Sequence, residues 1–324
     1  MEAPRRAAFD KAVKSGQVGL NGLYLNVLSG LARPEELVQA ARFSTQLSER
    51  LGVKIDTAMI SATPGHTWGL VPALALAGIR YLSTCPNFFD RIGITQVASA
   101  DQPFWWVGPS GREKILTWNT WMGYALSHTW NAKLTDAHVA EYLDHLEQVR
   151  YPYDITYIRW SGLGDNSEPE PGICDFVKDW NARYRWPRFI ISDQHAPFAA
   201  LEQRYGDRIP TRRGDWTPYW EDGAGSSARE TAMNRASADR MTQAGTVWAL
   251  RAPEAWPAAA ADSAWKKVLL YTEHTWGAWN SVSQPEQRFV KDQWDIKRGY
   301  AEEADWLSRK LLAGASPETE YAST

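Results

Sequence analysis

Short apolar segments suited to β-strands alternate with helical segments from the N-terminus to about residue 212. This alternation predicts parallel strands joined by crossover helices, and therefore an α/β barrel or an open α/β sheet. In both architectures, ligands bind beyond the carboxyl ends of the strands. The predicted strands are 53–61, 79–83, 113–120, 155–159 and 189–192. The predicted helices are 7–15, 34–52, 69–77, 136–150, 174–184 and 197–205, with Thr135 as the N-cap of the fourth.

Beyond residue 212 the pattern becomes helical. Ser227 and Glu230 form a capping box ahead of a helix with an apolar stripe, and 255–272 and 286–312 are further helical candidates. Three such helices predict a small bundle. The sequence therefore predicts a β/α domain over 1–212, a helical domain over 213–313 and a polar tail over 314–324.

The composition argues against several functional classes. A net charge of −3 provides no basic face for nucleic acid. No apolar run approaches the roughly 20 residues that cross a bilayer, and the N-terminus has no signal-peptide apolar region. Cys85 and Cys174 form neither a disulfide framework nor a metal-spaced pair. We therefore expect a cytoplasmic protein that binds neither nucleic acid nor membrane.

One tripeptide, His-Thr-Trp, occurs three times, at 66–68, 128–130 and 274–276. Each copy follows an apolar or aromatic segment and lies near a turn, so we expect several loops to converge on one pocket. A satisfied histidine at a helix end is the alternative for a single copy. The chain also holds 18 tryptophans, whose flat rings stack on sugars, although most are expected to fill the core.

Several separate blocks of sequence carry a family resemblance. They are Gly22-Leu-Tyr-Leu-Asn, Arg33-Pro-Glu-Glu-Leu, Pro64-Gly-His-Thr-Trp-Gly-Leu-Val-Pro-Ala-Leu, Arg213-Gly-Asp-Trp-Thr-Pro-Tyr-Trp-Glu-Asp-Gly and Tyr271-Thr-Glu-His-Thr-Trp-Gly. Together they extend over nearly the whole chain and resemble the bacterial α-mannosidase-like branch of glycoside hydrolase family 38. The resemblance implies a seven-stranded β/α barrel followed by a three-helix bundle. It also implies a zinc ion and the retaining hydrolysis of α-linked mannosides.

The resemblance assigns roles to individual residues. His274 matches the metal-binding histidine of the helical part, and a neutral imidazole is a normal zinc ligand. Asp165, in Gly164-Asp165-Asn166, matches the general acid/base, although an Asx turn is the alternative. Trp216 matches a tryptophan of the sugar pocket. The full set of expected sugar contacts is His66, Trp68, His128, Trp216, Tyr219, Asp222 and Trp276.

The sequence departs from the family at the second catalytic carboxylate. A retaining glycosidase needs a nucleophile about 5–5.5 Å from the acid. The family's aspartate at this place, which is also a zinc ligand, aligns with Ala62. Asp56 cannot replace it, because six residues of strand span about 20 Å. The His-x-Asp zinc motif of the first barrel strand occurs nowhere in the sequence, so we expect an incomplete barrel without that strand.

Three functions remain open. The first is an α-mannosidase-type hydrolase of α-linked mannosides, retaining and zinc-dependent, impaired at Ala62; the family favours an enzyme. The second is a non-catalytic relative that binds carbohydrate without zinc or nucleophile. The third is a zinc hydrolase in which the three His-Thr-Trp loops supply three histidine ligands.

A barrel without its first strand has open edges, which proteins must cover or pair. We expect either that residues 7–28 partly fill the gap or that two copies associate there as a homodimer.

Overall fold

The computed structural model describes residues 3–86, 99–122, 125–216, 222–275 and 280–315. The chain packs as two compact units, which are described separately. The first comprises Met1–Tyr24 and Phe43–Tyr219, and the second comprises Leu25–Arg42 and Trp220–Thr324. The division falls within helix α2 (Pro34–Leu51). The predicted domain limits at residues 212 and 313 stay a prediction, and residues 316–324 of the predicted tail lie outside the described residues.

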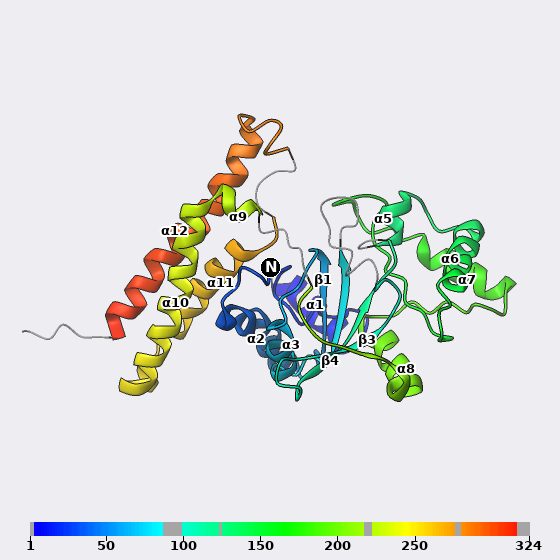
Figure 1. Ribbon diagram of the computed structural model, residues 1–324, viewed down its shortest axis with the longest axis horizontal. Coiled ribbons are helices and arrows are strands. Elements are labelled where there is room, and N and C mark those ends of the chain that lie inside the picture. The colour runs from blue at the N-terminus through cyan, green and yellow to red at the C-terminus, as the bar shows by residue number, and fades with distance from the viewer. Residues whose placement is uncertain (1–2, 87–98, 123–124, 217–221, 276–279, 316–324) are drawn as a thin grey trace, which may run out of the picture. The chain divides into compact units, whose positions relative to one another are not determined.

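The first unit contains a five-stranded sheet in the order β1-β2-β4-β3-β5 (Figure 1). Its strands are β1 (Thr57–Ala62), β2 (Tyr81–Pro86), β3 (Phe104–Val107), β4 (Lys114–Asn119) and β5 (Thr211–Arg212). Strands β1, β2 and β4 are parallel, whereas β3 is antiparallel to β4 and parallel to β5. The mixed α/β class is therefore confirmed. The seven-stranded barrel and the three-helix bundle stay predictions.

Three of the five predicted strands are confirmed. Those at 53–61, 79–83 and 113–120 correspond to β1, β2 and β4, with shifted limits. The predictions at 155–159 and 189–192 are wrong, because neither segment pairs with a strand in the part of the chain that the structure describes. Side chains of 155–159 pack onto the sheet instead, while Ile190 and Ile191 are exposed. Strands β3 and β5 were not predicted.

The helices of the first unit are α1 (Ala3–Lys14), the C-terminal half of α2, α3 (Leu70–Leu76), α5 (Leu126–Trp130), α6 (Asp136–Gln148), α7 (Ile173–Arg183), α8 (His195–Tyr205) and the 3₁₀ turn η1 (Gly206–Arg208). They lie close to their predicted positions, except that α5 and the 3₁₀ turn η1 were not predicted. The hydroxyl of Thr135 accepts a hydrogen bond from the His138 N–H at 3.3 Å. The predicted N-cap of α6 is thereby confirmed. No helix among the described residues has the length and apolar character of a membrane span.

The two faces of the sheet carry different aromatic layers. One face belongs to a buried cluster of strand and helix residues: Tyr81, Trp105, Leu116, Trp118, Phe198, Leu201 and Ile209. Side chains alternate along a strand, so Phe104 and Trp106 project from the opposite face. There the Trp106 ring stacks on Trp216, with 4.4 Å between their centroids. Each face of the sheet therefore has its own layer of aromatic side chains.

The segment before α2 covers the open edge of β1. The side-chain amide of Asn21 donates to the Met59 carbonyl at 3.0 Å and accepts from the Met59 N–H at 2.9 Å. The Gly22 N–H donates to the Thr57 carbonyl at 2.8 Å. These bonds satisfy edge groups that a neighbouring strand would otherwise pair. Residues 21 and 22 therefore cover this edge of the sheet. That they replace a missing barrel strand stays a prediction, as does the homodimer.

Replacing Asn21 should weaken the first unit. Asn21→Ala removes both bonds to the Met59 backbone, and we expect a loss of about 1–3 kcal/mol in the free energy of unfolding. Denaturant unfolding measures this, and size-exclusion chromatography reports whether the bared edge associates. Gln17→Ala, an exposed position in the same segment, is the matched control. Equal stability of the two variants would contradict the role of Asn21.

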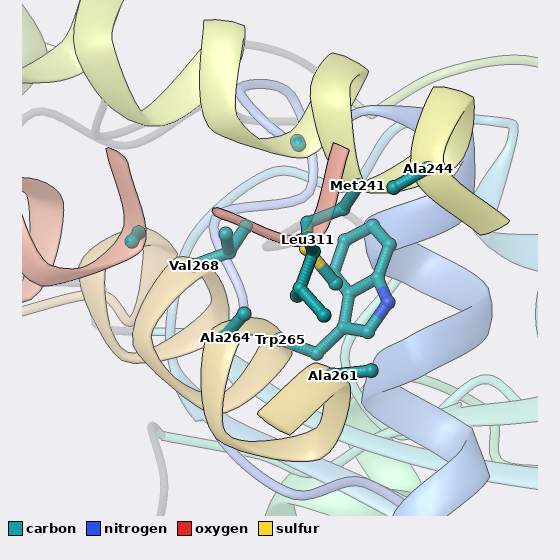
Figure 2. Close-up of a cluster of buried hydrophobic side chains, with 9 residues drawn as sticks. Met241, Ala244, Ala261, Ala264, Trp265, Val268 and Leu311 are labelled. Atoms are coloured by element: carbon teal, nitrogen blue, oxygen red, sulfur yellow. The ribbon is translucent and has the colours of Figure 1, made fainter. Parts of the chain in front are cut away.

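The second unit is mainly helical. Its helices are the N-terminal half of α2, α9 (Asp222–Ser226), α10 (Ala228–Arg251), the 3₁₀ turn η2 (Pro253–Ala255), α11 (Ala258–Thr272) and α12 (Arg288–Ala315). Helices α10, α11 and α12 meet around a buried cluster in which Trp265 is surrounded by small and aliphatic side chains such as Met241, Ala261 and Leu311 (Figure 2). The alanines allow close helix approach, and the indole fills the space between them.

The predicted capping box is wrong in its hydrogen bonding. Ser227 precedes α10 but its side chain makes no capping bond. Instead, its hydroxyl pairs with the hydroxyl of Tyr271 on α11 at 3.0 Å. A tertiary partner has replaced the local one, which the sequence pattern alone could not show.

Residues 25–42 are joined to the second unit by buried polar contacts. The Leu28 N–H donates to the Thr272 carbonyl at 3.0 Å. Glu36 is fully buried and accepts from the Thr272 hydroxyl at 2.9 Å and from the Arg33 N–H at 3.1 Å. Burial raises the pKa of Glu36 to about 7, although these hydrogen bonds favour its ionised form.

The Glu36 carboxyl should make stability fall as the pH rises. Its pKa is about 7 when folded, against 4.5 ordinarily, so the folded state binds more protons than the unfolded state between these values. We expect the free energy of unfolding to decrease across this window by roughly 3 kcal/mol in total. Urea unfolding at several pH values measures the slope. Glu36→Gln should remove this component, whereas Glu35→Gln, its partly exposed neighbour, should retain it.

Candidate functional site

The carboxyl ends of β1, β2 and β4 lie at one edge of the sheet, because the three strands are parallel (Figure 1). The register places Ser61 beside Cys85 near this edge. The Cys85 thiol contacts the hydroxyl of Thr120, which directly follows β4. The edge therefore presents hydroxyl and thiol groups from neighbouring strands. We call this set, Ser61, Cys85 and Thr120, the carboxyl-edge row.

The segment 151–160 lies over the face of the sheet that carries Trp105 and Trp118. The Tyr157 ring meets Trp118 edge-on at 5.6 Å between centroids, and its hydroxyl lies 3.5 Å from that of Ser83. Two residues further along, Arg159 Nη2 donates to Ser61 Oγ at 2.5 Å. Arg159 was missed from the sequence. Its signal was a basic residue at the end of an apolar run, directly before the loop that carries Asp165.

Asp165 lies in a tight turn within the loop 161–172. The Ser167 hydroxyl donates to the Gly164 carbonyl at 2.8 Å and accepts from the Gly164 N–H at 3.0 Å, and Asn166 has a φ of 54°. A serine side chain thus holds the turn. Asp165 itself is exposed at its tip, a position from which a carboxylate can meet a ligand.

Helix α5 carries the second His-Thr-Trp copy and lies beside the base of this loop. The Leu126 N–H donates to the Arg159 carbonyl at 3.1 Å, and the Ser161 N–H donates to Ser127 Oγ at 3.0 Å. His128, the next residue of α5, is partly exposed. Hydrogen bonding therefore links the His128 helix to the segment that joins Arg159 and Asp165.

His66 and Trp216 come together, but on the opposite face of the sheet. Their backbones form two hydrogen bonds of 2.9 and 3.0 Å, and their rings lie 5.6 Å apart. His66 is 0% exposed and Trp216 only 5% exposed, so neither side chain offers a surface to a sugar in this structure. Neither ring nitrogen of His66 has a hydrogen-bond partner within the part of the chain that the structure describes, and burial lowers its pKa to about 3. Their expected role as sugar contacts gains no support from this packing.

The remaining expected sugar contacts are less informative. Trp68 is partly exposed, and its indole N–H donates to the Val107 carbonyl at 2.8 Å. Tyr219 and Trp276 lie outside the described residues. Asp222 begins α9, but its side chain also lies outside them.

In the second unit, His274 lies two residues beyond Thr272, the last residue of α11. Its N–H donates to the Asn26 carbonyl at 3.0 Å, and its Nδ1 pairs with Glu273. Burial opposes ionisation of Glu273, but the His274 contact and the charge of Lys297 bring its pKa down to about 2. Lys297 is itself buried and donates to the carbonyls of Leu270 and Glu273 at 2.9 and 2.8 Å. The imidazole is oriented by a carboxylate, as a metal-binding histidine often is.

The donors within the described residues do not fit a zinc ion. No group of three or more His, Cys, Asp or Glu side chains gathers there in a way that could hold a metal. Ala62 supplies a methyl group where the family resemblance requires a carboxylate ligand. Zinc binding stays a prediction of the family resemblance.

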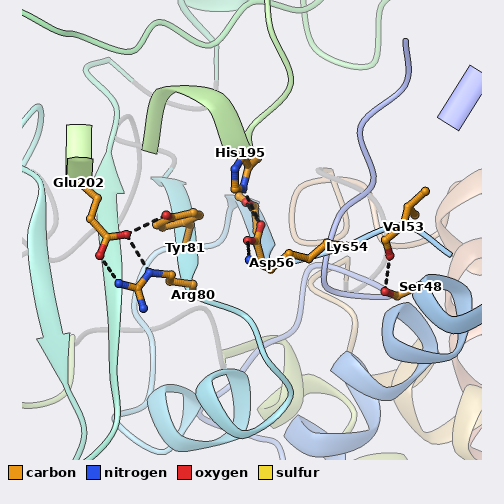
Figure 3. A network of polar contacts seen from close by, with 9 residues as sticks. Ser48, Val53, Lys54, Asp56, Arg80, Tyr81, His195 and Glu202 are labelled. Atoms are coloured by element: carbon orange, nitrogen blue, oxygen red, sulfur yellow. Dashed lines mark hydrogen bonds and ion pairs between the residues drawn. The ribbon is translucent and has the colours of Figure 1, made fainter. Parts of the chain in front are cut away.

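A second polar network lies at the amino ends of β1 and β2, opposite to the carboxyl-edge row (Figure 3). Asp56, just before β1, pairs with His195 at 2.8 Å and with Lys54 at 2.7 Å. Glu202 of α8 pairs with Arg80 and accepts from the Tyr81 hydroxyl at 2.8 Å. Every charge in this network has an opposite partner. Its role is to fix α8 against the amino ends of β1 and β2.

Comparison with known proteins supports a fold relationship. No family profile and no curated protein matches the sequence. The structure is similar to an α-mannosidase from Enterococcus faecalis V583, with a TM-score of 0.71 and 17% identity over 96% of this chain and 35% of that chain. A 4-α-glucanotransferase from Thermococcus litoralis gives a TM-score of 0.47 and 11% identity over 91% of this chain and 50% of that one.

The chain thus spans about a third of the α-mannosidase that it matches. At 17% identity, this similarity shows a shared fold. The fold agrees with the resemblance to glycoside hydrolase family 38, and membership of that family stays a prediction.

The His66 ring should remain neutral at ordinary pH. A buried imidazole without a hydrogen-bond partner or counter-charge resists protonation, and its pKa is about 3. Heteronuclear NMR of the histidine rings should show no titration of His66 between pH 5 and 8. A His66→Gln variant identifies its signals. A midpoint near 6.5 would contradict the buried, neutral state.

Proposed function

We propose that this chain belongs to an α-mannosidase-like glycoside hydrolase and binds α-linked mannosides at the carboxyl edge of β1, β2 and β4. The main support is the fold shared with an α-mannosidase over 96% of the chain. The architecture that goes with this proposal is an incomplete seven-stranded β/α barrel followed by a three-helix bundle. The carboxyl edge is where parallel α/β sheets place their ligands.

Asp165 is the proposed general acid/base. It is exposed on the turn that follows Arg159, so its carboxyl group can approach a glycosidic oxygen. A protonated carboxyl donates to the leaving group and afterwards activates water. His128 is partly exposed and is the proposed sugar contact in the first unit. The Trp68 indole bonds Val107, which pairs with the first residue of β4, so it lies away from this site. His66 and Trp216 are proposed to support the fold from the other face.

Ala62 limits the chemistry of this chain. A retaining mechanism needs a second carboxylate to attack the anomeric carbon, and a methyl group cannot do so. Ala62 also has a φ of 65°, a left-handed conformation that aspartate tolerates better than alanine. We therefore propose that the chain still binds sugar but hydrolyses it only very weakly by the retaining mechanism. This observation also favours the second candidate, a carbohydrate-binding relative without catalysis.

Binding of a mannoside tests the proposal. Tryptophan fluorescence and calorimetry should show that methyl α-mannoside binds about tenfold or more tightly than methyl α-glucoside, because misplaced hydroxyls leave polar groups unpaired. Absence of mannoside binding, or equal affinity for both sugars, would overturn the assignment. Zinc content of the purified protein, measured alongside, reports separately on the cofactor that the family resemblance implies.

Turnover of p-nitrophenyl α-mannoside tests the catalytic part. We expect a rate only slightly above background, and Asp165→Asn should lower it to the background rate if acid catalysis operates. Asp207→Asn, an exposed aspartate in η1, is the matched control. Efficient turnover that does not depend on Asp165 would contradict this assignment of the acid.

A further inference from the structure

Arg159 carries a positive charge that has no ionic partner among the described residues. No carboxylate in the described part of the chain lies within ion-pairing distance of its guanidinium. Its Nη1 is buried and donates to no acceptor, and its Nη2 donates to Ser61 Oγ at 2.5 Å. By contrast, Arg80 pairs with Glu202 and Arg183 pairs with Asp136.

The groups around Arg159 are neutral. Nη2 also lies 2.5 Å from the thioether sulfur of Met59, and the carboxyl-edge row supplies only hydroxyl and thiol groups. Arg159 is only partly exposed, and a half-buried cation without a counter-charge is unfavourable. The buried Nη1 without an acceptor adds to that cost. An anion from a ligand would satisfy both requirements. A guanidinium suits this purpose because its planar fork matches a carboxylate or a phosphate.

The position of Arg159 ties this anion to the proposed sugar site. Its partner Ser61 directly precedes Ala62 at the end of β1, and its own chain runs on into the Asp165 loop. An anion held here would lie beside Ser61 at the carboxyl end of β1, where the sugar is proposed to bind. The uncharged side chain of Ala62 contributes no negative charge to neutralise the guanidinium.

We propose that Arg159 and Ser61 bind an anionic group of the ligand, so that this chain prefers mannosides bearing a carboxylate or a phosphate over neutral ones. The sugar half of this inference rests on the proposed function. The anion half rests on Arg159 alone, and the two are tested separately below.

Calorimetric titrations compare mannose, mannose 6-phosphate, mannuronic acid and inorganic phosphate. We expect at least one anionic sugar to bind about tenfold or more tightly than mannose at low salt, because charge-assisted bidentate bonds are strong. This preference should decrease at 0.3 M salt. The phosphorylated and the carboxylated sugar distinguish the two sources of the anion.

Three variants locate the effect. Arg159→Gln should abolish the preference, and Arg159→Lys should retain part of it, because lysine keeps the charge but loses the fork. Arg112→Gln makes the same change of charge at an exposed position before β4 and should bind like the wild type. Thermal unfolding of each variant verifies its fold. If Arg159→Gln does not fold, Arg159→Lys and the salt dependence of the wild type decide.

The outcomes separate the two proposals. Phosphate binding that requires Arg159, together with no sugar binding, would retain the anion site and overturn the mannoside function. Binding of mannose with equal or better affinity than both anionic sugars would overturn the anion site and retain the function. Loss of affinity for all sugars alike in Arg159→Gln would also overturn it, because that is the result of a purely structural role.

Discussion

The parallel register of β1, β2 and β4 is the constraint on which the candidate site depends. It places the ends of three strands at one edge and makes Ser61 and Cys85 neighbours although the sequence separates them. The apolar packing of Trp118 with Phe198 and Tyr157 fixes what lies over that face. Tyr157 in turn sets the position of Arg159. In an extended segment, side chains two residues apart point to the same side, so the Arg159 side chain follows that of Tyr157 toward the carboxyl ends of the strands.

Electrostatics differ sharply between the two edges of the sheet. At the amino edge, Asp56 pairs with Lys54 and Glu202 pairs with Arg80, so the charges neutralise one another within the protein. At the carboxyl edge, Arg159 meets only neutral groups in the described chain. A compensated network contributes to the fold and needs nothing from outside. An uncompensated one costs stability, and proteins keep such groups mainly where a ligand uses them.

The sequence indicated the elements better than their surroundings. Periodicity located β1, β2, β4 and the long helices because local patterns determine them. It misread 155–159, since an apolar run that packs on a sheet looks like a strand within it. It gave no sign that His66 and Trp216 would be buried on the other face, because burial depends on which strand pairs with which. Arg159 could not be predicted as a binding residue, because its lack of an ionic partner among the described residues depends on three-dimensional packing.

The path of the chain between the two units has a consequence for biosynthesis. Residues 25–42 belong to the second unit, yet the rest of that unit begins only at Trp220. While the ribosome makes the intervening residues, Leu28 and Glu36 have no Thr272 to bond. The buried carboxyl of Glu36 must therefore stay hydrated until α11 emerges. The first unit can assemble its sheet during this interval, whereas the second must close the long loop formed by residues 43–219, and loop closure of this length costs conformational entropy.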